Sequence, residues 1–350
     1  MKILVTGAAG FIGSWVSRAL VERGDAVLCI DSINDYYDVR LKRERLRRML
    51  GFETEGDNIP FSEMFTSKTY PAVRFIRMSI EDKNLLDYLF ATENFDIVVN
   101  LAAQAGVRYS LSAPYSYMQS NLVGFLNILE ACRFHNTKKL VFASSSSVYG
   151  KNAKTPFTED DMVGYPVSLY AASKRSNELM AYVYSNLYGT SAIGLRYFTV
   201  YGPWGRPDMS PMLFANAMLK GEAIQVFNKG DMYRDFTYIE DVVAGTLRAV
   251  DYEIGKSDCP NGVPCKIYNI GCGNPVRLMD FVGEMETVFG IKALIEFLPM
   301  QSGDVYQTYA DTSRMEADMG FRPQWSLHDG IAEFAKWYKS DENPLLDWNN

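Results

Sequence analysis

Short apolar runs alternate with longer amphipathic stretches over the first two hundred residues of this 350-residue chain. The runs at 2–6, 26–30 and 73–78 have the length of buried strands, whereas the stretch from Gly13 to about residue 23 and the stretch at 83–92 carry apolar residues at helical spacing. A regular strand–helix–strand order predicts parallel strands joined by crossover helices. The expected fold is therefore α/β, a Rossmann-type doubly wound parallel sheet.

This alternation continues to about residue 196 and then weakens. Strands are expected at 96–100, 139–143 and 191–196, and helices at 114–135 and from Ser168 onward. Beyond them lies a loop punctuated by Pro and Gly at 202–207, followed by scattered short elements. The expected organisation is a main domain at 1–200 to which segments near 239–252 and 267–270 return, a discontinuous and smaller C-terminal substrate-binding lobe over most of 201–338, and a loose tail at 339–350.

Two polar stretches are predicted to lie at the surface. Residues 38–49 contain six basic side chains against Glu44, and such a charge run is most simply explained as a solvated helix face. The segment Gly51–Tyr70 is polar and rich in turn formers, which predicts a surface loop.

Composition narrows the class of protein. Hydrophobic residues make up 47% and charged residues 22%, as in ordinary globular proteins, and the net charge of −7 argues against a generic binder of nucleic acid or of anionic membranes. The five cysteines contain no Cys-x-x-Cys pair, so we expect reduced packing residues and no metal site. With no cationic leader and no apolar run of ~18 residues, the chain is expected to be soluble and cytoplasmic.

A glycine turn follows the first expected strand. Gly7, Gly10 and Gly13 precede a helix, and Asp31 ends the next strand, 24 residues after Gly7. In a dinucleotide-binding βαβ unit, such glycines let the backbone approach a pyrophosphate at the helix N-terminus. Asp31 is placed to accept hydrogen bonds from a ribose 2′-hydroxyl and would repel a 2′-phosphate, so NAD is favoured over NADP.

A Tyr-x-x-x-Lys pair, Tyr170 and Lys174, follows a run of four serines at 144–147. On a helix, positions i and i+4 share a face, so both side chains can reach one site. A cation close to a phenol favours the phenolate and lowers its pKa, so Tyr170 is a candidate general base. The glycine turn, Ala102–Gln104 and the serines all follow strands, and should converge on one crevice at the carboxyl edge of the sheet.

Together these stretches resemble the extended short-chain dehydrogenase/reductase superfamily and, within it, the nucleotide-sugar 4-epimerases of the UDP-glucuronate type. The resemblance covers nearly the whole chain. It rests on residues 6–13, 31–37, 100–108, 144–150, 170–174, 199–209 and 234–238. The glycine and Tyr/Lys motifs mark only the superfamily, whereas Asn34–Tyr37 and Arg206–Met209 point to glucuronate.

The resemblance implies roles at the cofactor side and the reacting centre. Tyr170 resembles the catalytic base, Lys174 its cationic neighbour that also binds the nicotinamide ribose, and Ser145 the residue that bonds the sugar O4. Tightly bound, recycled NAD would be held by Gly7, Gly10, Phe11, Ile12, Gly13, Asp31, Ser32, Asn34, Leu101, Ala102, Ala103, Gln104, Tyr170, Lys174 and Tyr197. Ser79 departs from the pattern, since many relatives carry an adenine-contacting Asp there.

The resemblance also implies a UDP-sugar site. Arg234 matches a residue that holds the UDP phosphates, and Asp304 lies near the uridine ribose. Arg206, with the hydroxyls of Ser146 and Thr199, would orient the sugar carboxylate, because a 4-keto glucuronate is a β-keto acid that loses CO2 when that bond aligns with the keto group. The alternative for Arg206 is a loop arginine that pairs with Asp208. Gln301 stands where galactose-type epimerases place a phosphate-binding Arg.

The implied reaction is 4-epimerisation of UDP-glucuronate to UDP-galacturonate through a 4-keto intermediate, with no net redox change. A 4-epimerase of a neutral UDP-hexose is the main alternative. A decarboxylase or a dehydratase is disfavoured because acids of those relatives are replaced by hydroxyls at Ser145–Ser147. A non-catalytic NAD sensor is a further alternative. The resemblance also implies a homodimer packed through helices near 114–135 and 168–188.

Overall fold

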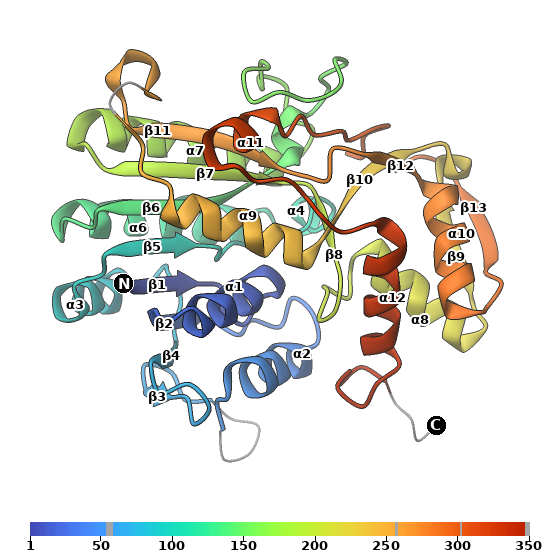
Figure 1. Cartoon of the computed structure of the whole chain (residues 1–350), viewed down its shortest axis with the longest axis horizontal. Helices are drawn as coiled ribbons and strands as arrows, with labels where there is room; N and C mark the ends of the chain where they lie inside the picture. The colour runs from blue at the N-terminus through green and yellow to red at the C-terminus, as the bar shows by residue number, and fades with distance from the viewer. Residues whose placement is uncertain (54–58, 256–257, 302, 347–350) are drawn as a thin grey trace.

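An eight-stranded sheet forms the centre of the computed structural model, which describes residues 1–53, 59–255, 258–301 and 303–346 (Figure 1). Its strands in spatial order are β11 (Cys265–Ile270), β7 (Ser191–Tyr197), β6 (Lys139–Ser145), β5 (Ile97–Asn100), β1 (Lys2–Thr6), β2 (Ala26–Asp31), β4 (Val73–Arg77) and β3 (Met64–Thr66). Neighbouring strands are parallel except for β3, which runs antiparallel to β4. The sheet confirms the predicted α/β fold class.

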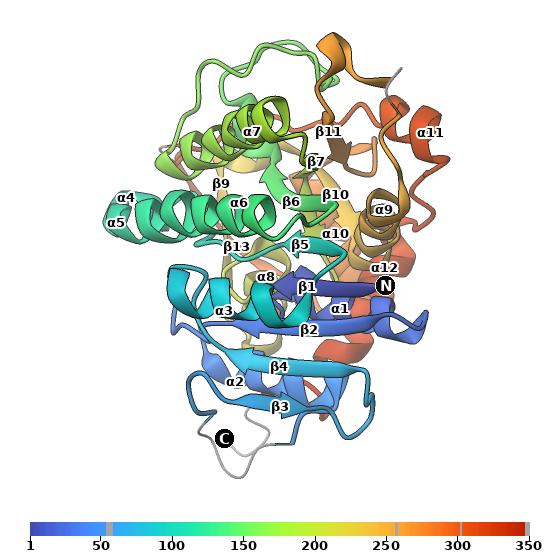
Figure 2. The same cartoon turned by 90° about the vertical axis from the view of Figure 1, so that its left-hand side faces the viewer.

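Helices cover both faces of this sheet. On one face α1 and α9 pack against each other, and on the other α3, α6 and α7 lie side by side (Figure 2). Successive residues of β1 alternate between the two cores, with Ile3 and Val5 facing one and Leu4 the other. The helices are α1 (Phe11–Glu22), α2 (Val39–Glu44), α3 (Lys83–Glu93), α4 (Tyr109–Ser112), α5 (Pro114–Tyr117), α6 (Phe125–Phe134), α7 (Leu169–Tyr188), α8 (Ser210–Lys220), α9 (Ile239–Asp251), α10 (Leu278–Phe289), α11 (Ser313–Met319) and α12 (Leu327–Tyr338).

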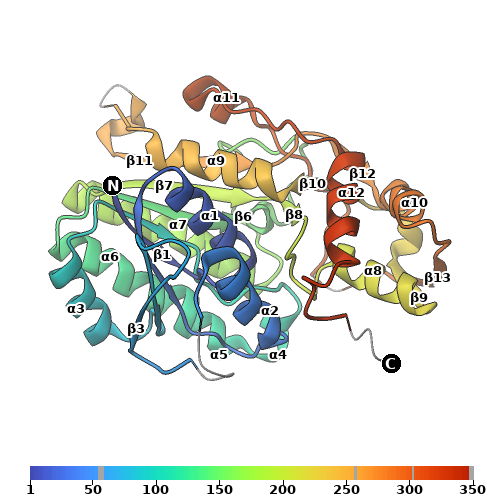
Figure 3. The same cartoon turned by 60° about the horizontal axis from the view of Figure 1, so that its bottom comes forward.

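A smaller group of elements lies beside the main sheet (Figure 3). It contains a three-stranded sheet of β12 (Pro275–Arg277), β10 (Tyr233–Tyr238) and β8 (Thr199–Tyr201), and a two-stranded sheet of β13 (Leu294–Leu298) and β9 (Ala223–Phe227). The helices α8, α10 and α12 accompany these strands (Figure 3). Two late segments lie with the main sheet instead: β11 pairs with β7, and α9 packs on α1.

The carboxyl ends of the parallel strands face the smaller group. The strand order reverses at β1, which pairs with β2 on one side and with β5 on the other. The turn after β1 contains Gly7 and Gly10, Gly13 lies in the first turn of α1, and the segment after β5 begins at Leu101. Open α/β sheets bind ligands at such a switch point.

The structure corrects the prediction for residues 38–49. The segment forms α2 and a π-helical turn (Arg45–Met49), and it is not a solvated face throughout. Lys42 and Arg45 are buried, at 5% and 0% exposure, whereas Arg47 and Arg48 pair at the surface with Glu44. Charge alone therefore did not separate the two faces of this helix.

The predicted surface loop at 51–70 is also partly wrong. Met64–Thr66 forms the edge strand β3, and Phe52, Ile59 and Ser67 are buried. A three-residue edge strand carries too little period-two pattern to be recognised in a polar segment. Residues 54–58 of this stretch lie outside the described residues.

The C-terminal segment, predicted as a loose tail, can be described as far as residue 346. Asn343 is buried, and its side-chain amide donates to the carbonyl of Tyr338 at the end of α12. The guanidinium of Arg48 donates to the carbonyl of Asp341. Residues 347–350 lie outside the described residues.

The cysteines are free thiols, and Cys29 and Cys132 are buried in the cores on opposite faces of the sheet. Burial raises the pKa of both thiols to about 12. Among the described residues, no helix has the length and apolarity needed to cross a membrane.

Candidate active site

One cavity of about 1070 Å³ lies between the carboxyl edge of the main sheet and the smaller group of elements. Each site residue predicted from the sequence lines it, from the glycine turn at one end to Arg234 and Asp304 at the other. These residues come from the ends of β1, β2, β5, β6 and β7, from the start of α1, from α7, from β8 and β10, and from the loops that contain Arg206 and Asp304. The fold thus brings together positions up to 297 residues apart, from Gly7 to Asp304.

The glycine turn is too crowded for side chains. Gly7 has a φ of +69°, and a Cβ built there would lie 2.7 Å from the backbone nitrogen of Ala102. A Cβ on Gly13 would lie 2.1 Å from the carbonyl oxygen of Gly7. The helix α1 begins at Phe11 without a side-chain cap, and its first residues line the cavity. Unpaired N–H groups at a helix N-terminus favour an anion, as the pyrophosphate of a dinucleotide requires.

Asp31 lies at the end of β2 and is nearly buried. Its carboxylate accepts hydrogen bonds from the backbone N–H groups of Ala9, at 3.1 Å, and of Ile33, at 2.7 Å. Asn34 is fixed by Lys42, whose ammonium donates to its side-chain oxygen at 2.6 Å and to its carbonyl at 2.8 Å. The acid that would bind a ribose is therefore held in place by the same turn that would bind the pyrophosphate.

Further cofactor-side positions are fixed by the protein itself. The backbone N–H of Gln104 donates to the side chain of Asn121 at 2.8 Å, and Asn121 in turn donates to Ser173 of α7. Tyr197 shares a hydrogen bond of 2.9 Å with Thr246 of α9, so its hydroxyl is occupied within the protein. Leu101, Ala102 and Ala103 line the cavity without a charged group.

The serine run ends β6 and starts a short 3₁₀ turn. Ser145 caps this turn, because its hydroxyl accepts a hydrogen bond from the backbone N–H of Ser147 at 3.2 Å. Its neighbour Ser146 also faces the cavity. Opposite them, α7 begins at Leu169 with Ser168 as its N-cap, and this start presents Tyr170 and Lys174 on the same side of the helix.

The pKa of Tyr170 is shifted in the opposite direction from the one predicted. Burial raises it, while the charge of Arg206 and the hydroxyl of Ser145 act to lower it. The Lys174 ammonium donates to the carbonyl of Ala143 at 2.8 Å, and burial lowers its pKa to about 8. The cation that acts on Tyr170 in the structure is thus Arg206, and desolvation outweighs it.

A buried ion pair fixes α7 against the strand ends. Glu178, one turn beyond Lys174, accepts two hydrogen bonds from Arg196 of β7 at 2.8 and 2.9 Å. It also accepts one from the hydroxyl of Ser144 at 2.6 Å. Arg196 and Glu178 are both almost fully buried, and the pair ties the helix of Tyr170 to both β6 and β7. Sequence reasoning missed this pair because the partners are 18 residues apart and belong to different elements.

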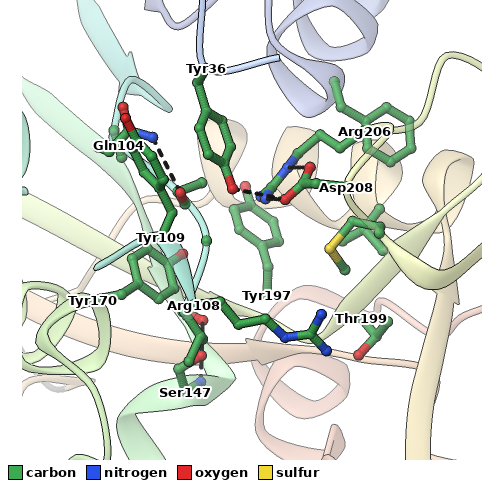
Figure 4. Close-up of a pocket in the computed structure, with 18 of the residues that line it drawn as sticks. Tyr36, Gln104, Arg108, Tyr109, Ser147, Tyr170, Tyr197, Thr199, Arg206 and Asp208 are labelled. Atoms are coloured by element: carbon green, nitrogen blue, oxygen red, sulfur yellow. Dashed lines mark hydrogen bonds and ion pairs between the residues drawn. The ribbon is translucent and has the colours of Figure 1, made fainter. Parts of the chain in front are cut away.

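Arg206 makes the pairing that the alternative interpretation predicted, while it also lines the cavity. Its Nε and Nη2 donate to the carboxylate of Asp208 at 3.1 and 2.5 Å. Tyr36 donates to the same carboxylate at 2.9 Å, as Figure 4 shows. Burial opposes ionisation of Asp208, but Arg206 lowers its pKa below the usual value. Arg206 is thus an oriented cation whose Nη1 has no hydrogen-bond partner among the described residues.

The second predicted pair of substrate residues is also joined. Arg234 donates through Nη2 to Asp304 at 2.7 Å and through Nη1 to the carbonyls of Tyr233 and Tyr306. Thr199 starts β8, which pairs with β10 just beyond Arg234. Arg234 and Thr199 therefore sit on paired strands at the same end of the cavity.

Arg108 is a cavity residue to which the sequence assigned no role. Its side chain extends into the cavity (Figure 4), with its guanidinium 5.1 Å from the ring centre of Phe227. No carboxylate pairs with it in the part of the chain that the structure describes. Its place at the end of the 100–108 stretch, close after β5, was the available signal.

Arg45 is a second residue that the sequence analysis missed. Its guanidinium, fully buried, donates to carbonyl groups of the glycine turn and of the loop before Arg206. Leu41, Arg45 and Met49 are four residues apart and share one buried face. That helical spacing was the signal that could have distinguished Arg45 from Arg47.

The cofactor side of the cavity fits a dinucleotide. Its turn has no room for a Cβ at Gly7 or Gly13, its helix start is uncapped, and a carboxylate stands at the end of the second strand. The residue directly after Asp31 is Ser32, and not an arginine that could bind a 2′-phosphate. These features match NAD better than NADP.

Comparison with known proteins places these features in a family. Residues 3–271 match the NAD dependent epimerase/dehydratase family. The chain is 44% identical over 349 residues to UDP-glucuronate 4-epimerase 3 of Arabidopsis thaliana, with 96% of this chain and 76% of that protein covered.

Solved structures agree. The UDP-glucuronic acid 4-epimerase of Bacillus cereus, in complex with UDP-glucuronic acid and NAD, superposes with a TM-score of 0.83 at 32% identity, covering 97% of this chain and 99% of that one. The UDP-glucose 4-epimerase of Thermotoga maritima, with UDP-glucose, gives 0.82 at 28% identity, covering 97% and 98%. The predicted kinship is confirmed, and the chain belongs to the NAD dependent epimerase/dehydratase family.

Proposed function

We propose that the protein is a UDP-glucuronate 4-epimerase that interconverts UDP-glucuronate and UDP-galacturonate with bound NAD. The relatives and solved structures named above support the reaction class. The observation that carries the choice of sugar is Arg206, an oriented guanidinium that lines the same cavity as Tyr170 and keeps Nη1 without a hydrogen-bond partner among the described residues.

Tyr170 acts as the base on the sugar O4, and Ser145 holds that hydroxyl. NAD, held by the glycine turn and Asp31, would supply reversible hydride transfer at C4 of the sugar, with no net redox change. Because burial holds the pKa of Tyr170 above its usual value, the phenol is neutral before ligands bind. To act as the base, Tyr170 must first lose this proton to solvent, and the charge of Arg206 and the hydroxyl of Ser145 are the groups that favour its phenolate.

Arg206 restrains the sugar carboxylate. Two of its donors are used by Asp208, and Nη1 is left for the substrate. Ser146 and Thr199, which line the same cavity, add hydroxyl donors. A carboxylate held in this way is kept out of alignment with the C4 keto group, so CO2 is retained.

Arg234 and Asp304 hold the UDP moiety, with Arg108 as an additional cation for the diphosphate. In this arrangement, residues 1–200 with the returning segments bind NAD and also contribute Arg108, Ser145, Ser146 and Thr199 to the nucleotide sugar. The lobe within 201–338 supplies the rest of the sugar-nucleotide site. The Arg234–Asp304 ion pair would share its guanidinium with the phosphates on binding.

A 4-epimerase of a neutral UDP-hexose is the second candidate. The observation in its favour is that Arg206 already has a carboxylate partner, Asp208, and so does not require one from the substrate. A UDP-glucose 4-epimerase is also among the similar structures. Against it stands the Nη1 of Arg206, for which a neutral sugar supplies no carboxylate and which has no hydrogen-bond partner among the described residues.

The deciding experiment is to incubate the purified protein with UDP-glucuronate, without added NAD, and to follow the anomeric sugar protons by NMR. We expect UDP-galacturonate, with neither UDP-pentose nor net NADH. A UDP-pentose product would identify a decarboxylase. No conversion of UDP-glucuronate, but conversion of UDP-glucose, would establish the neutral-hexose alternative. No turnover of either, with NAD bound, would favour the sensor.

We further propose a homodimer packed through α6 and α7. These helices lie side by side on one face (Figure 2) and expose apolar side chains, Leu126 at 39%, Leu179 at 52%, Val183 at 48% and Leu187 at 61%. Contiguous exposed apolar side chains on adjacent helices are typical of an interface. Sedimentation of the protein as a monomer at micromolar concentration would reject this proposal.

A further inference from the structure

Arg45 is a fully buried arginine, and its partners among the described residues are all uncharged. Its Nη1 donates to the carbonyl of Ala9 at 3.0 Å and to the hydroxyl of Tyr37 at 2.7 Å. Its Nε and Nη2 donate to the carbonyl of Trp204 at 3.1 and 2.6 Å, and Nη2 also reaches the carbonyl of Gly205 at 3.2 Å. Burying a charge without a counter-ion is costly. The five hydrogen bonds offset this cost, and they fix Arg45 to the segments that it contacts.

These bonds join two segments that are far apart in the sequence, the glycine turn and the loop before Arg206. Ala9 belongs to the glycine turn, and its N–H is in turn held by Asp31. Trp204 and Gly205 directly precede Arg206. The only planar fork that donates in several directions at once is a guanidinium, so a lysine at position 45 could not reproduce the connection.

The backbone before Arg206 needs this support. Trp204 has a φ of 64°, a left-handed conformation that a bulky residue adopts only when its surroundings impose it. Its buried ring packs on that of Trp337, with 5.2 Å between the ring centroids. The indole N–H of Trp15 donates to the carbonyl of Pro203 at 3.2 Å. The loop thus reaches Arg206 in one fixed conformation.

A second set of hydrogen bonds fixes the side chain of Arg206 itself. Tyr37 bonds Arg45, and its neighbour Tyr36 donates to Asp208, the carboxylate that grips Arg206 (Figure 4). The segment at 34–37 and the segment at 206–209 therefore form one hydrogen-bonded unit. Arg45 anchors the backbone of this unit, and Tyr36 anchors its carboxylate.

Resting on the proposed function, we propose that Arg45 is a positioning residue for substrate recognition. It fixes the loop at 202–208 to the glycine turn, so that the free Nη1 of Arg206 faces the sugar carboxylate. Arg45 itself lies outside the cavity and acts through Arg206. Its loss should therefore affect the carboxylated sugar and leave the UDP moiety unaffected.

The test compares ligand affinities in a Tyr170→Phe background, in which turnover is suppressed. Calorimetry would measure UDP-glucuronate and UDP with Arg45→Lys, Arg206→Ala and the double variant, at matched NAD content. We expect Arg45→Lys to weaken UDP-glucuronate binding about 10-fold, as for loss of one charged hydrogen bond, with UDP affinity unchanged. In the Arg206→Ala background, Arg45→Lys should have no further effect, because the two residues act as one unit.

Arg47→Lys is the matched control, since Arg47 lies two residues away, is exposed and pairs with Glu44. It should change neither affinity. If Arg45→Lys does not fold, Tyr37→Phe removes a single hydrogen bond to Arg45 and should produce the same selective loss at smaller size.

Two results would overturn the inference. Equal weakening of UDP and UDP-glucuronate by Arg45→Lys would mean a general structural role, and additive losses in the double variant would mean that Arg45 does not act through Arg206. If Arg206→Ala itself leaves UDP-glucuronate affinity unchanged, the carboxylate assignment of the proposed function fails instead.

Discussion

The two ends of the cavity are built by different means. At the cofactor end, backbone groups and small residues set the shape: Gly7 and Gly13 admit no Cβ, and Asp31 bonds backbone N–H groups. At the sugar end, arginines are held by the protein's own carboxylates, Arg206 by Asp208 and Arg234 by Asp304. The first end is defined by steric fit, and the second by charges that a ligand must share. Substitutions at the two ends should therefore fail in different ways.

The largest effect is expected at the cofactor end, with Gly13→Ala. The added Cβ would lie 2.1 Å from the Gly7 carbonyl oxygen, and backbone cannot yield as a flexible side chain does. We expect the NAD content of the purified protein to fall more than about 10-fold, equivalent to ~1.4 kcal/mol or more, and turnover to fall with it.

Gly283→Ala in α10 is the control, because a Cβ there meets no atom within 4 Å. NAD released by acid would be assayed enzymatically in both variants. Full retention of NAD in Gly13→Ala would show that the turn is not the rigid cradle described above.

A smaller and ligand-dependent effect is expected at the sugar end. Arg206→Ala should weaken UDP-glucuronate about 10-fold and leave UDP unchanged, whereas Arg234→Ala should weaken both by about 10–100-fold. The reason is that only the uronate carries a carboxylate, while both ligands carry the diphosphate. Neither variant should lose NAD.

Titration calorimetry with both nucleotides measures this split. If Arg206→Ala weakened UDP as much as UDP-glucuronate, Arg206 would be assigned to the diphosphate. Loss of NAD from either variant would mean that the two ends are not separate.

The last effect is on stability and not on ligand binding, and it concerns Lys174, which lies between the two ends. Burial lowers its pKa from 10.5 to about 8. Between these values the unfolded chain binds a proton that the folded chain has released, so stability rises with pH in this window. The cost of burying the charge is present in full below pH 8 and is relieved above it.

Thermal unfolding of the wild type and of Lys174→Met, at matched NAD content, would be compared at pH 7.5 and 9.5. Relative to the variant, the free energy of unfolding of the wild type should increase by on the order of 1 kcal/mol per pH unit above about pH 8. An equal pH response of the two proteins would mean that Lys174 keeps its charge through a partner.

Much of the fold could be predicted because strong local patterns coincide with buried elements. The ranges predicted for β1, β2 and α3 agree with the structure to within one residue, since each has an apolar period matched to its element. The helix predicted after Gly13 begins earlier, at Phe11, because the glycine turn already enters its first turn. The predicted helix at 114–135 is observed as α5, a π-helical stretch (Met118–Gly124) and α6. The edge strand β3 was missed because three residues carry no usable period.

The direction of the pKa shift of Tyr170 could not be predicted from its spacing to Lys174. Spacing places two side chains on one face, but it does not report burial, and burial is the largest influence on Tyr170. The predicted cationic neighbour bonds a carbonyl instead, and the cation that acts on the phenol is Arg206, 36 residues further along the chain.

The sequence by itself determined the βαβ order, the glycine turn with its acid, and the set of polar residues at the strand ends. These are local patterns, and local sterics and periodicity are written in neighbouring residues. Only the tertiary structure decided that Arg206 and Arg234 are held by Asp208 and Asp304, that Glu178 locks α7 to two strands, and that Arg45 is buried while Arg47 is not. Burial and hydrogen-bond partners depend on which distant segments meet, and that is fixed only when the sheet and its helices close around one another.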